Sequence, residues 1–451
     1  MQHRDETSAT VNPAIAKWGG AFGLPEFDRI SDADLADAFA VAFPAHLAEI
    51  EAIAENPKPA SFQNTIIPLE MAGDLLTRAS GIFWNLTGAN TNDALQALER
   101  KLSPEFSRHY STITMNRALF ARIDALYQQR DGLGLNAEAM RVLELTWKSF
   151  VRSGAQLDKV AQSKLAGVNE RLATLGTSFS QNVLADESSY ALILDSAEDL
   201  KGVPDFLLSC MAAAASERGH EGKHAVTLSR SIIEPFLTFS ERRDLRETAF
   251  TAWVARGENS GDHDNRPLVA ELVKLRASKA KLLGYDSFAH FKLDNTMAKT
   301  PKNVRNLLET VWGKARDRAA AEATELSRMI VAEGQNHDVA PWDWRHYAEK
   351  VRAERYDFNE AEVKPYLQLE KMIEAAFYTA ERLFGLRFRK IEGVEAYHPD
   401  VRIFEVTDSS DRRVAIFLAD YFARTSKRSG AWMSDFQEQH RLLAGDESGD
   451  G

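Results

Sequence analysis

Residues 220–224 carry the most explicit catalytic motif in the chain, because they read His-Glu-Gly-Lys-His and satisfy the pattern H-E-x-x-H. In zinc peptidases the two histidines of this pattern lie one helical turn apart and bind one zinc ion, while the glutamate polarises a zinc-bound water. That geometry requires a helix, but glycines at 219 and 222 interrupt the stretch and a β-prone run at 225–229 follows it. We therefore predict a turn followed by a strand, and interpret His220, Glu221 and His224 as an accidental match that holds no metal.

No other sequence pattern supplies a catalytic centre. The chain contains no phosphate-binding loop, no dinucleotide-binding fingerprint and no nucleophile elbow. Cys210 is its only cysteine, which excludes an internal disulfide, and the apolar neighbours of Cys210 predict a buried side chain. The other histidines lack ligand spacing, so we expect surface or helix-capping roles for them; they include His46, His109, His290, His346, His398 and His440. We assign no catalytic residue.

A second candidate for function lies at residues 427–436, which read Lys-Arg-Ser-Gly-Ala-Trp-Met-Ser-Asp-Phe. Two alternating apolar runs precede it, at 401–406 and 414–418, and the polar residues between them predict a β-hairpin. Gly430 and Ala431 have the small side chains that a close backbone approach needs, and Trp432 can form an apolar wall. The alternative is that Gly430 makes a turn and Trp432 anchors the core, and the sequence leaves both readings open.

Composition indicates a globular protein without a polyanionic partner. The chain has 451 residues, 44% of them hydrophobic and 27% charged, and its 55 Lys and Arg against 66 Asp and Glu give a formal charge of −11. That charge opposes binding to nucleic acid or to an anionic membrane. The first residues lack the apolar region of a secretion signal, and no run approaches membrane-spanning length. We therefore expect a cytoplasmic protein.

Helical periodicity dominates the sequence. Ser31 and the acidic residues after it form an N-terminal cap, and Leu35, Phe39, Phe43, Leu47 and Ile50 follow at intervals of four and three. A longer stripe predicts a core helix at 154–187; it consists of Ala161, Leu165, Val168, Leu172, Leu175 and Phe179. Two β-prone runs flank a helix at 203–218 and predict a small sheet element, at 190–194 and 224–228. Further helices are expected at 240–256, 267–283, 287–297, 301–333, 342–355 and 370–384.

Several short segments, in one order along the chain, resemble a family of zinc peptidases that includes thimet oligopeptidase, oligopeptidase A and, most similar, bacterial peptidyl-dipeptidase. The matching segments include Asn12-Pro13, Leu24-Pro25-Glu26-Phe27, Leu282-Leu283-Gly284-Tyr285, Trp342-Asp343-Trp344-Arg345-His346-Tyr347 and Lys427-Arg428-Ser429-Gly430-Ala431-Trp432. The resemblance implies a mainly α, two-lobed helical architecture with small β elements around a deep channel. It also implies zinc-dependent hydrolysis of short peptides with release of dipeptides from their carboxyl ends, and it implies that the segment with Gly430, Ala431 and Trp432 binds substrate.

In this family the zinc-binding H-E-x-x-H helix follows the hairpin region, whereas this sequence ends in the polar residues 445–451. We therefore expect an incomplete second lobe, no tightly held zinc and a chain inactive alone. The alternatives are a peptide-binding or scaffold protein without catalysis, and half of a split peptidase completed by a downstream chain. The apolar faces of residues 372–388 and 401–422 should then be exposed, with poor solubility or association as the consequence.

The same resemblance suggests six segments along the chain. A flexible terminus at 1–11 precedes a helical region at 12–188, a small mixed α/β element at 189–232 and a second helical region at 233–396. The hairpin and the start of the catalytic region occupy 397–445, and a polar tail occupies 446–451.

Overall fold

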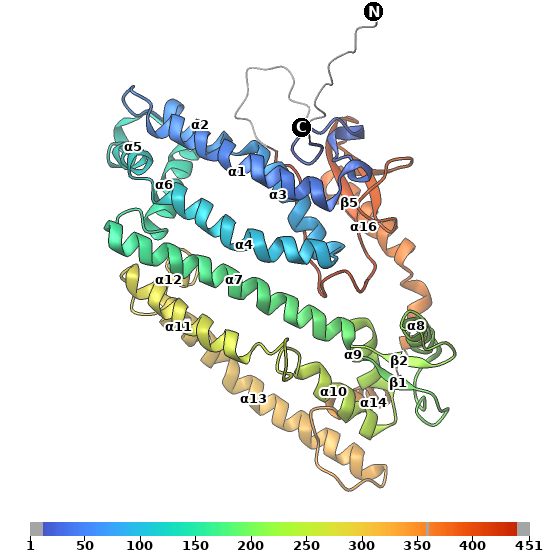
Figure 1. Ribbon diagram of the computed structural model, residues 1–451. Helices are drawn as coiled ribbons and strands as arrows, with labels where there is room; N and C mark the ends of the chain where they lie inside the picture. Colours follow the sequence, from blue (N-terminus) through green and yellow to red (C-terminus); the bar gives the residue numbers. More distant parts are fainter. Residues whose placement is uncertain (1–11, 358–359, 440–451) are drawn as a thin grey trace, which may run out of the picture. The chain divides into compact units, whose positions relative to one another are not determined.

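The computed structural model describes residues 12–357 and 360–439 of the chain. Helices dominate these residues, and five strands form two small antiparallel sheets, which confirms the predicted mainly α class (Figure 1). The chain divides into two compact units: the first comprises residues 1–177 and 374–451, and the second comprises residues 178–373. The predictions for 1–11, for 446–451 and for His440 lie outside the described residues, and the six-segment division stays a prediction.

The first unit contains a series of helices followed by a three-stranded sheet. Its described α-helices are α1 (Asp32–Ala54), α2 (Ile67–Met71), α3 (Asp74–Ala89), α4 (Asp93–Thr114), α5 (Arg117–Gln128), α6 (Ala137–Arg152) and the first part of α7 (Lys159–Ser189), and the last part of α16 (Leu369–Phe384) also belongs to it. Its short 3-10 or π turns are η1 (Ala21–Gly23), η2 (Phe27–Arg29), η3 (Phe62–Ile66) and η4 (Arg130–Gly132).

The first helix shows how local sequence specifies this unit. The Ser31 side chain accepts a hydrogen bond from the Asp34 backbone N–H, and the Asp34 carboxylate accepts one from Ser31, which forms the predicted N-terminal cap. Phe39 is buried and meets Phe83 of α3 and Phe106 of α4 with ring centroids 5.4 Å apart in each case. The apolar stripe of α1 therefore forms the centre of the core of the first unit.

The sheet of the first unit has the order β3-β4-β5, with every pair antiparallel. Strands β4 (Arg402–Thr407) and β5 (Arg413–Ala419) form the predicted hairpin, whereas β3 (Arg387–Ile391) was not predicted. Phe404 of the central strand lies opposite Lys390 and Phe417. Phe377 of α16 stacks on Phe388 at 4.1 Å between ring centroids, which packs that helix against the sheet.

The second unit is also helical. Its elements are the last part of α7, strand β1 (Leu192–Leu194), α8 (Asp205–Ser216), strand β2 (His224–Val226), α9 (Arg230–Phe239), α10 (Arg243–Val254), α11 (Arg266–Leu282), α12 (Phe288–Leu293), α13 (Pro301–Ala332), α14 (Trp344–Tyr356), α15 (Glu360–Val363), the 3-10 turn η5 (Lys364–Tyr366) and the first part of α16. Strands β1 and β2 pair as predicted, and α8 lies between them in sequence. Their core contains Leu207, Met211 and Phe236.

Large apolar side chains remain exposed in both units. On α16 the exposed fraction reaches 73% for Phe384, which confirms the predicted exposure of that helix. The hairpin region is exposed only in part: Phe417 and Phe422 are 39% and 44% exposed, whereas Ile403 and Phe404 are buried. The solubility consequence stays a prediction.

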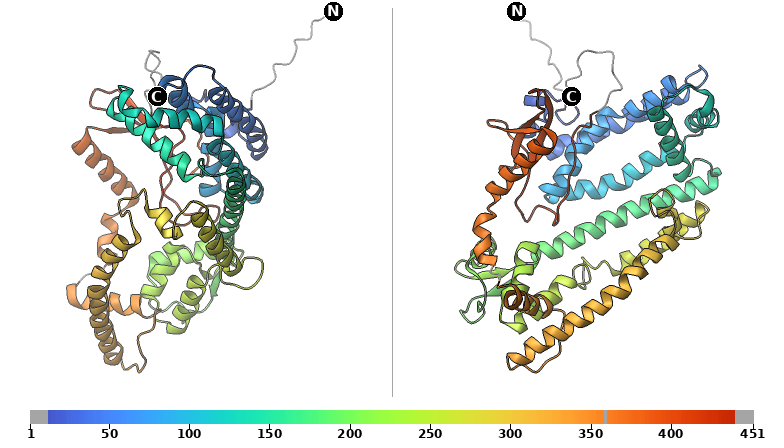
Figure 2. Two further views of the ribbon diagram at one scale, coloured as in Figure 1. Left: turned by 90° about the vertical axis from the view of Figure 1, so that its left-hand side faces the viewer. Right: turned by 180° about the vertical axis from the view of Figure 1, so that it is seen from behind.

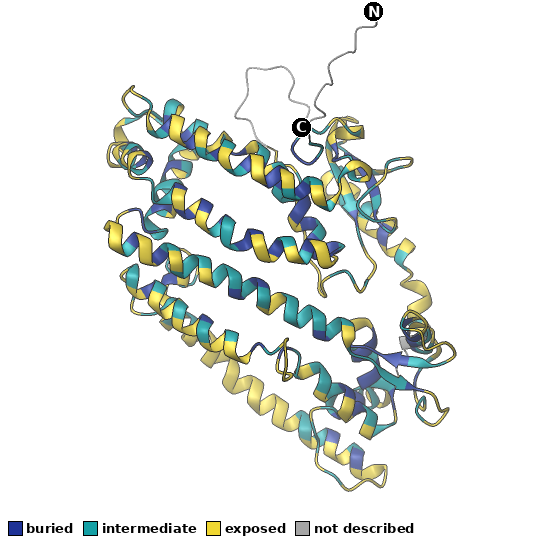
Figure 3. Cartoon of the chain, viewed as in Figure 1, coloured by how far each residue is buried: buried dark blue, intermediate teal, exposed yellow. Residues whose placement is uncertain are grey.

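Helix α13 has an exposed apolar stripe that was not predicted. The helix is one continuous rod in Figure 2, and Figure 3 shows its middle as exposed. The side chain of Trp312 in this stripe is 65% exposed. Among the described helices, none combines the length and apolar composition that crossing a bilayer requires.

Candidate functional site

A buried carboxylate fixes the chain immediately after the hairpin. Asp420 accepts hydrogen bonds from both terminal nitrogens of Arg424 (2.9 and 2.7 Å) and from the hydroxyl of Tyr397 (3.1 Å), and its Oδ1 lies 3.0 Å from Nζ of Lys427. The side chains of Asp420, Arg424 and Lys427 are at most 10% exposed. We call Tyr397, Asp420, Arg424 and Lys427 the anchor cluster. It ties the end of β5 to the segment that leads to Gly430.

The anchor cluster sets one carboxylate, Asp420, against the two cations Arg424 and Lys427, and Asp400 lies 3.7 Å from Arg424 as a second carboxylate. Burial alone would raise the pKa of Asp420, but the hydrogen bonds and charges of Arg424 and Lys427 lower it below its ordinary value. Burial raises the pKa of Tyr397, and the neighbouring Asp420 charge raises it further. Tyr397 therefore stays a neutral hydrogen-bond donor and Asp420 an anion at neutral pH.

The same segment is hydrogen-bonded to the carboxyl end of α3. Arg428 N–H donates to the carbonyl of Gly88 at 2.9 Å, and Arg424 Nη2 donates to the carbonyl of Ala89 at 2.7 Å. Arg428 also donates to the buried carboxylate of Glu99 at 3.1 Å. Helix carboxyl ends carry unsatisfied carbonyls and a partial negative charge, so two arginines are well matched to this position.

The predicted substrate-binding residues lie just beyond these contacts. Gly430 has φ +116°, a backbone angle that L side chains rarely adopt, and nothing lies within 4 Å of where a Cβ would be. Ala431 is exposed, and Trp432 is 46% exposed, with its Cζ2 atom 3.8 Å from the position that a Cβ on Gly88 would occupy. The structure therefore brings all three residues to the surface on an anchored segment, while their contact with a peptide stays a prediction.

The H-E-x-x-H stretch does not have zincin geometry. Helix α8 ends before it: Gly219 has φ +77°, Gly219 N–H donates to Ser216, and His220 N–H donates to Ala215, which together form a Schellman cap. His224 lies in β2, opposite Leu194. The two histidines thus belong to a turn and a strand, as predicted, and do not share one helical face. Glu221 accepts a hydrogen bond from Ser216 at 2.6 Å.

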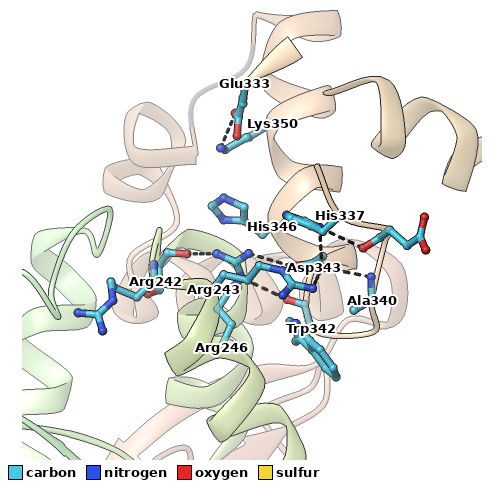
Figure 4. A network of polar contacts seen from close by, with 12 residues as sticks. Arg242, Arg243, Arg246, Glu333, His337, Ala340, Trp342, Asp343, His346 and Lys350 are labelled. Atoms are coloured by element: carbon cyan, nitrogen blue, oxygen red, sulfur yellow. Dashed lines mark hydrogen bonds and ion pairs between the residues drawn. The ribbon is translucent and has the colours of Figure 1, made fainter. Parts of the chain in front are cut away.

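The second unit contains a buried ionic network that no local sequence pattern predicts (Figure 4). Asp343, which is 0% exposed, accepts hydrogen bonds from Arg246 Nη2 and Arg243 Nη2 at 3.0 Å each and from Ala340 N–H at 3.1 Å. Arg246 also donates to the carbonyls of Ser240 (2.7 Å) and Trp342 (3.2 Å). This network connects α10 to the start of α14. We assign it a structural role, because the Asp343 carboxylate is fully occupied by Arg243, Arg246 and Ala340.

Three histidines for which surface or capping roles were predicted are buried instead. Nε2 of His109 lies 3.0 Å from Nδ1 of His46, and burial lowers the pKa of both, that of His109 to about 4. His346 donates from Nδ1 to the Thr238 carbonyl at 3.0 Å, and burial lowers its pKa to about 4, aided by the positive charges of Arg246 and Lys350. The spacing of His46, four residues before buried Ile50 and seven after buried Phe39, was the available signal.

The prediction for Cys210 was also wrong. Its side chain is exposed, because the buried stripe of α8 runs through Leu207, Met211, Ala214 and Ala215 and leaves Cys210 outside. The apolar neighbours in the sequence did not show which face of the helix is covered.

The fold and these sites define a mainly helical protein with a β-hairpin, an anchored glycine-containing segment after the hairpin, and no group of three potential metal ligands among the described residues. Residues 236–449 match the model of peptidase family M3. The chain is 38% identical over 434 residues to the dipeptidyl carboxypeptidase of Escherichia coli (strain K12), an alignment that covers 96% of this chain and 64% of that protein.

Oligopeptidase A of Salmonella typhimurium is 28% identical, over 96% of this chain and 64% of that protein. The organellar oligopeptidase A of Arabidopsis thaliana is also 28% identical, over 98% of this chain and 56% of the relative. The chain is therefore similar to peptidase family M3 along residues 236–449, and it spans 64% of the length of the dipeptidyl carboxypeptidase.

The zinc that this family implies does not fit the residues described here. The only H-E-x-x-H match divides its histidines between a turn and a strand. Across residues 12–357 and 360–439, no three His, Cys, Asp or Glu side chains are grouped so that they could hold a metal ion. We therefore derive no catalytic step through zinc from this chain.

Proposed function

We propose that this chain is the peptide-holding part of a zinc-dependent peptidase that releases dipeptides from the carboxyl ends of short peptides. The observation that carries the proposal is the 38% identity to a dipeptidyl carboxypeptidase across 96% of the chain. Short peptides are the proposed ligands. The net charge of −11 argues against nucleic acid and anionic membrane as partners. The cytoplasmic location stays a prediction from the sequence.

The proposed peptide site combines an edge strand with the anchored segment. Strand β5 is at the edge of the described sheet, so one side of its backbone can pair with an extended peptide. Main-chain pairing does not depend on side-chain identity, which suits an enzyme that accepts many sequences. Gly430 and Ala431 leave room for a second backbone, and the exposed ring of Trp432 supplies apolar contact.

The anchor cluster would keep this surface in one conformation before a peptide arrives. A loop that is ordered beforehand does not lose conformational entropy on binding, so affinity rises without any new contact. Asp420 has three side-chain partners, and Arg424 and Arg428 hold the segment on the carbonyls of α3. Asp420 is therefore the main positioning residue of the proposed site.

We further propose that the chain binds peptides but does not hydrolyse them alone. Its described residues group no metal ligands, so hydrolysis would need ligands supplied by another polypeptide segment, as in a split peptidase. The second candidate function, a peptide-binding or scaffold protein without catalysis, is favoured by the same observation. The two differ in what happens when the rest of a family catalytic region is supplied.

Peptide binding by the purified chain tests the first part of this proposal. Fluorescence anisotropy of a labelled hexapeptide should show saturable binding, and Trp432→Ala should weaken it about tenfold or more, as for other tryptophans that become buried on binding. Trp312→Ala is the matched control, because Trp312 is also exposed but lies in the second unit. Unchanged binding in Trp432→Ala would remove the proposed site.

The catalytic part needs a separate readout. Chromatography of the hexapeptide after incubation with the chain alone should show intact peptide, and metal analysis should show no stoichiometric zinc. Co-expression with the carboxyl-terminal part of the Escherichia coli dipeptidyl carboxypeptidase should restore dipeptide release if the chain is half of a split enzyme. Intact peptide in a co-purifying complex would instead favour the binding or scaffold function.

A further inference from the structure

The second unit has a pocket of about 490 Å³ that the peptide site does not use. It lies along one face of α9 and one face of α14, and it is bordered by Phe206 of α8 and Lys364 of η5. The lining residues recur about one helical turn apart on each helix. The lining from α9 is Arg230, Glu234, Pro235, Thr238 and Phe239, and that from α14 is Trp344, Arg345, Ala348, Glu349 and Arg352.

The pocket is positive in an acidic protein. Four cationic side chains and two carboxylates line it, an excess of two positive charges, whereas the whole chain carries −11. Arg352 donates two hydrogen bonds to Glu349, at 2.8 and 2.6 Å. The nearest atoms of Arg345 and Glu234 are 3.6 Å apart, longer than a hydrogen bond, and the Arg345 guanidinium lies over the ring of Trp253. Glu349 therefore pairs with Arg352, and Glu234 is nearest to Arg345, so neither carboxylate compensates the other two cations of the pocket.

The two remaining cations have no carboxylate partner within the part of the chain that the structure describes. Arg230 is exposed at the first position of α9. Lys364 is exposed, and its ammonium group lies 3.1 Å from the centroid of the Phe206 ring, a cation–π contact that leaves its charge uncompensated. Two uncompensated cations on one pocket favour an anionic ligand.

The other walls favour an apolar body on that ligand. Phe206, Phe239 and Trp344 contribute aromatic surface, and Pro235 and Ala348 add aliphatic surface. A pocket of this volume accommodates a small molecule, and small-molecule sites typically combine apolar walls with a few polar groups that fix orientation.

We infer that this pocket binds a small anion with an apolar ring or branched chain, its carboxylate or phosphate group on Arg230 and Lys364 and its apolar part against Phe206 and Phe239. All residues that line this pocket belong to the second unit, whereas Gly430 to Trp432 belong to the first, and the inference does not rest on the proposed peptidase function. Such a ligand would stabilise the packing of α8, α9 and α14 by binding the folded second unit only.

Isothermal titration with three probes tests the inference. N-acetylphenylalanine and phenyl phosphate carry the anion on an aromatic body, and N-acetylphenylalanine amide lacks the charge. We expect at least one anionic probe to bind about tenfold more tightly than the amide, and the one that binds better identifies carboxylate or phosphate as the preferred group. Equal binding of all three probes, or binding of none, would overturn the inference.

Two variants and a matched control locate the binding. Arg230→Gln and Lys364→Gln should each weaken the anionic probe about three- to tenfold, without changing the thermal midpoint of the free chain, because both side chains are exposed. Lys314→Gln makes the same charge change on the exposed middle of α13 and should leave binding within about twofold. If Lys314→Gln weakened binding as much as the other two, the attraction would be general and not a property of this pocket.

Discussion

Replacing Asp343 by alanine should be among the most destabilising single changes in the second unit. The carboxylate is fully buried and accepts hydrogen bonds from Arg243, Arg246 and Ala340. Its removal leaves the guanidinium of Arg246, 1% exposed, with only the carbonyls of Ser240 and Trp342 as partners. Breaking a buried ion pair from one side typically costs about 3–5 kcal/mol, because the remaining charge stays buried without compensation.

The size of the effect follows from which groups lose solvent. Arg243 is partly exposed, so water can replace its lost partner, and most of the cost comes from Arg246. Asp343→Ala should therefore lower the free energy of unfolding of the second unit by about 3 kcal/mol or more, and its thermal midpoint by roughly 10 °C. Urea unfolding followed by tryptophan fluorescence measures the first quantity, and calorimetry measures the second.

Two further variants make this prediction refutable. Glu309→Ala removes an exposed partner of Arg305 on α13, both side chains being at least 65% exposed, and should cost under about 0.5 kcal/mol. The double variant Arg246→Met with Asp343→Leu removes both buried charges and should recover most of the loss. A cost below about 1 kcal/mol for Asp343→Ala, or a double variant less stable than Asp343→Ala, would refute the reasoning.

Three other predictions concern the first unit. Folding lowers the pKa of His109 from 6.5 to about 4, so between these two pH values the unfolded state binds more protons than the folded state. The contribution of this group to the free energy of unfolding should be complete above about pH 6.5 and fall by roughly 3 kcal/mol towards pH 4. Urea unfolding at several pH values should show this fall, and His109→Gln should flatten it. Asp420→Asn should cost about 2–3 kcal/mol and speed tryptic cleavage after Lys427, and a cleavage rate equal to that of the wild type would contradict the anchoring role of Asp420. Gly73→Ala should lower the free energy of unfolding by about 2–4 kcal/mol, because φ is +85° and the new Cβ would lie 2.8 Å from Nδ1 of His46. The control Gly219→Ala has a similar φ of +77° but open space around the new Cβ, and should lower it by only about 1 kcal/mol. Equal shifts of the thermal midpoint in the two variants would show that the contact with His46 is unimportant.

The sequence predicted elements whose signal is local. The cap at Ser31 and the stripe beyond it specify α1, and the alternating runs on either side of a polar turn specify β4 and β5. Strand β3 was missed because its residues, Arg-Phe-Arg-Lys-Ile, are mostly charged and do not alternate; it is a strand because it pairs with β4 and because Phe388 stacks on Phe377.

The networks that hold the candidate site were not predictable from the sequence in the same way. Arg246 and Asp343 are 97 residues apart in the chain, and Arg428 and Glu99 are 329 apart, so neither pair leaves a local pattern. The segment with Gly430 was found through a family resemblance and not through its partners. The turn at His220 was predictable, because glycines at 219 and 222 favour a turn over a helix. Both glycines adopt positive φ in the structure.

The central proposal is that this chain holds peptides on the segment with Gly430 and Trp432 and that its described residues form no catalytic metal site. The most direct test incubates the purified chain with a hexapeptide, with and without a chelator, and measures binding and cleavage in the same sample. We predict saturable binding that Trp432→Ala weakens and Trp312→Ala does not, with the peptide intact in every sample. Cleavage that the chelator abolishes would contradict this proposal, as would the absence of any peptide binding.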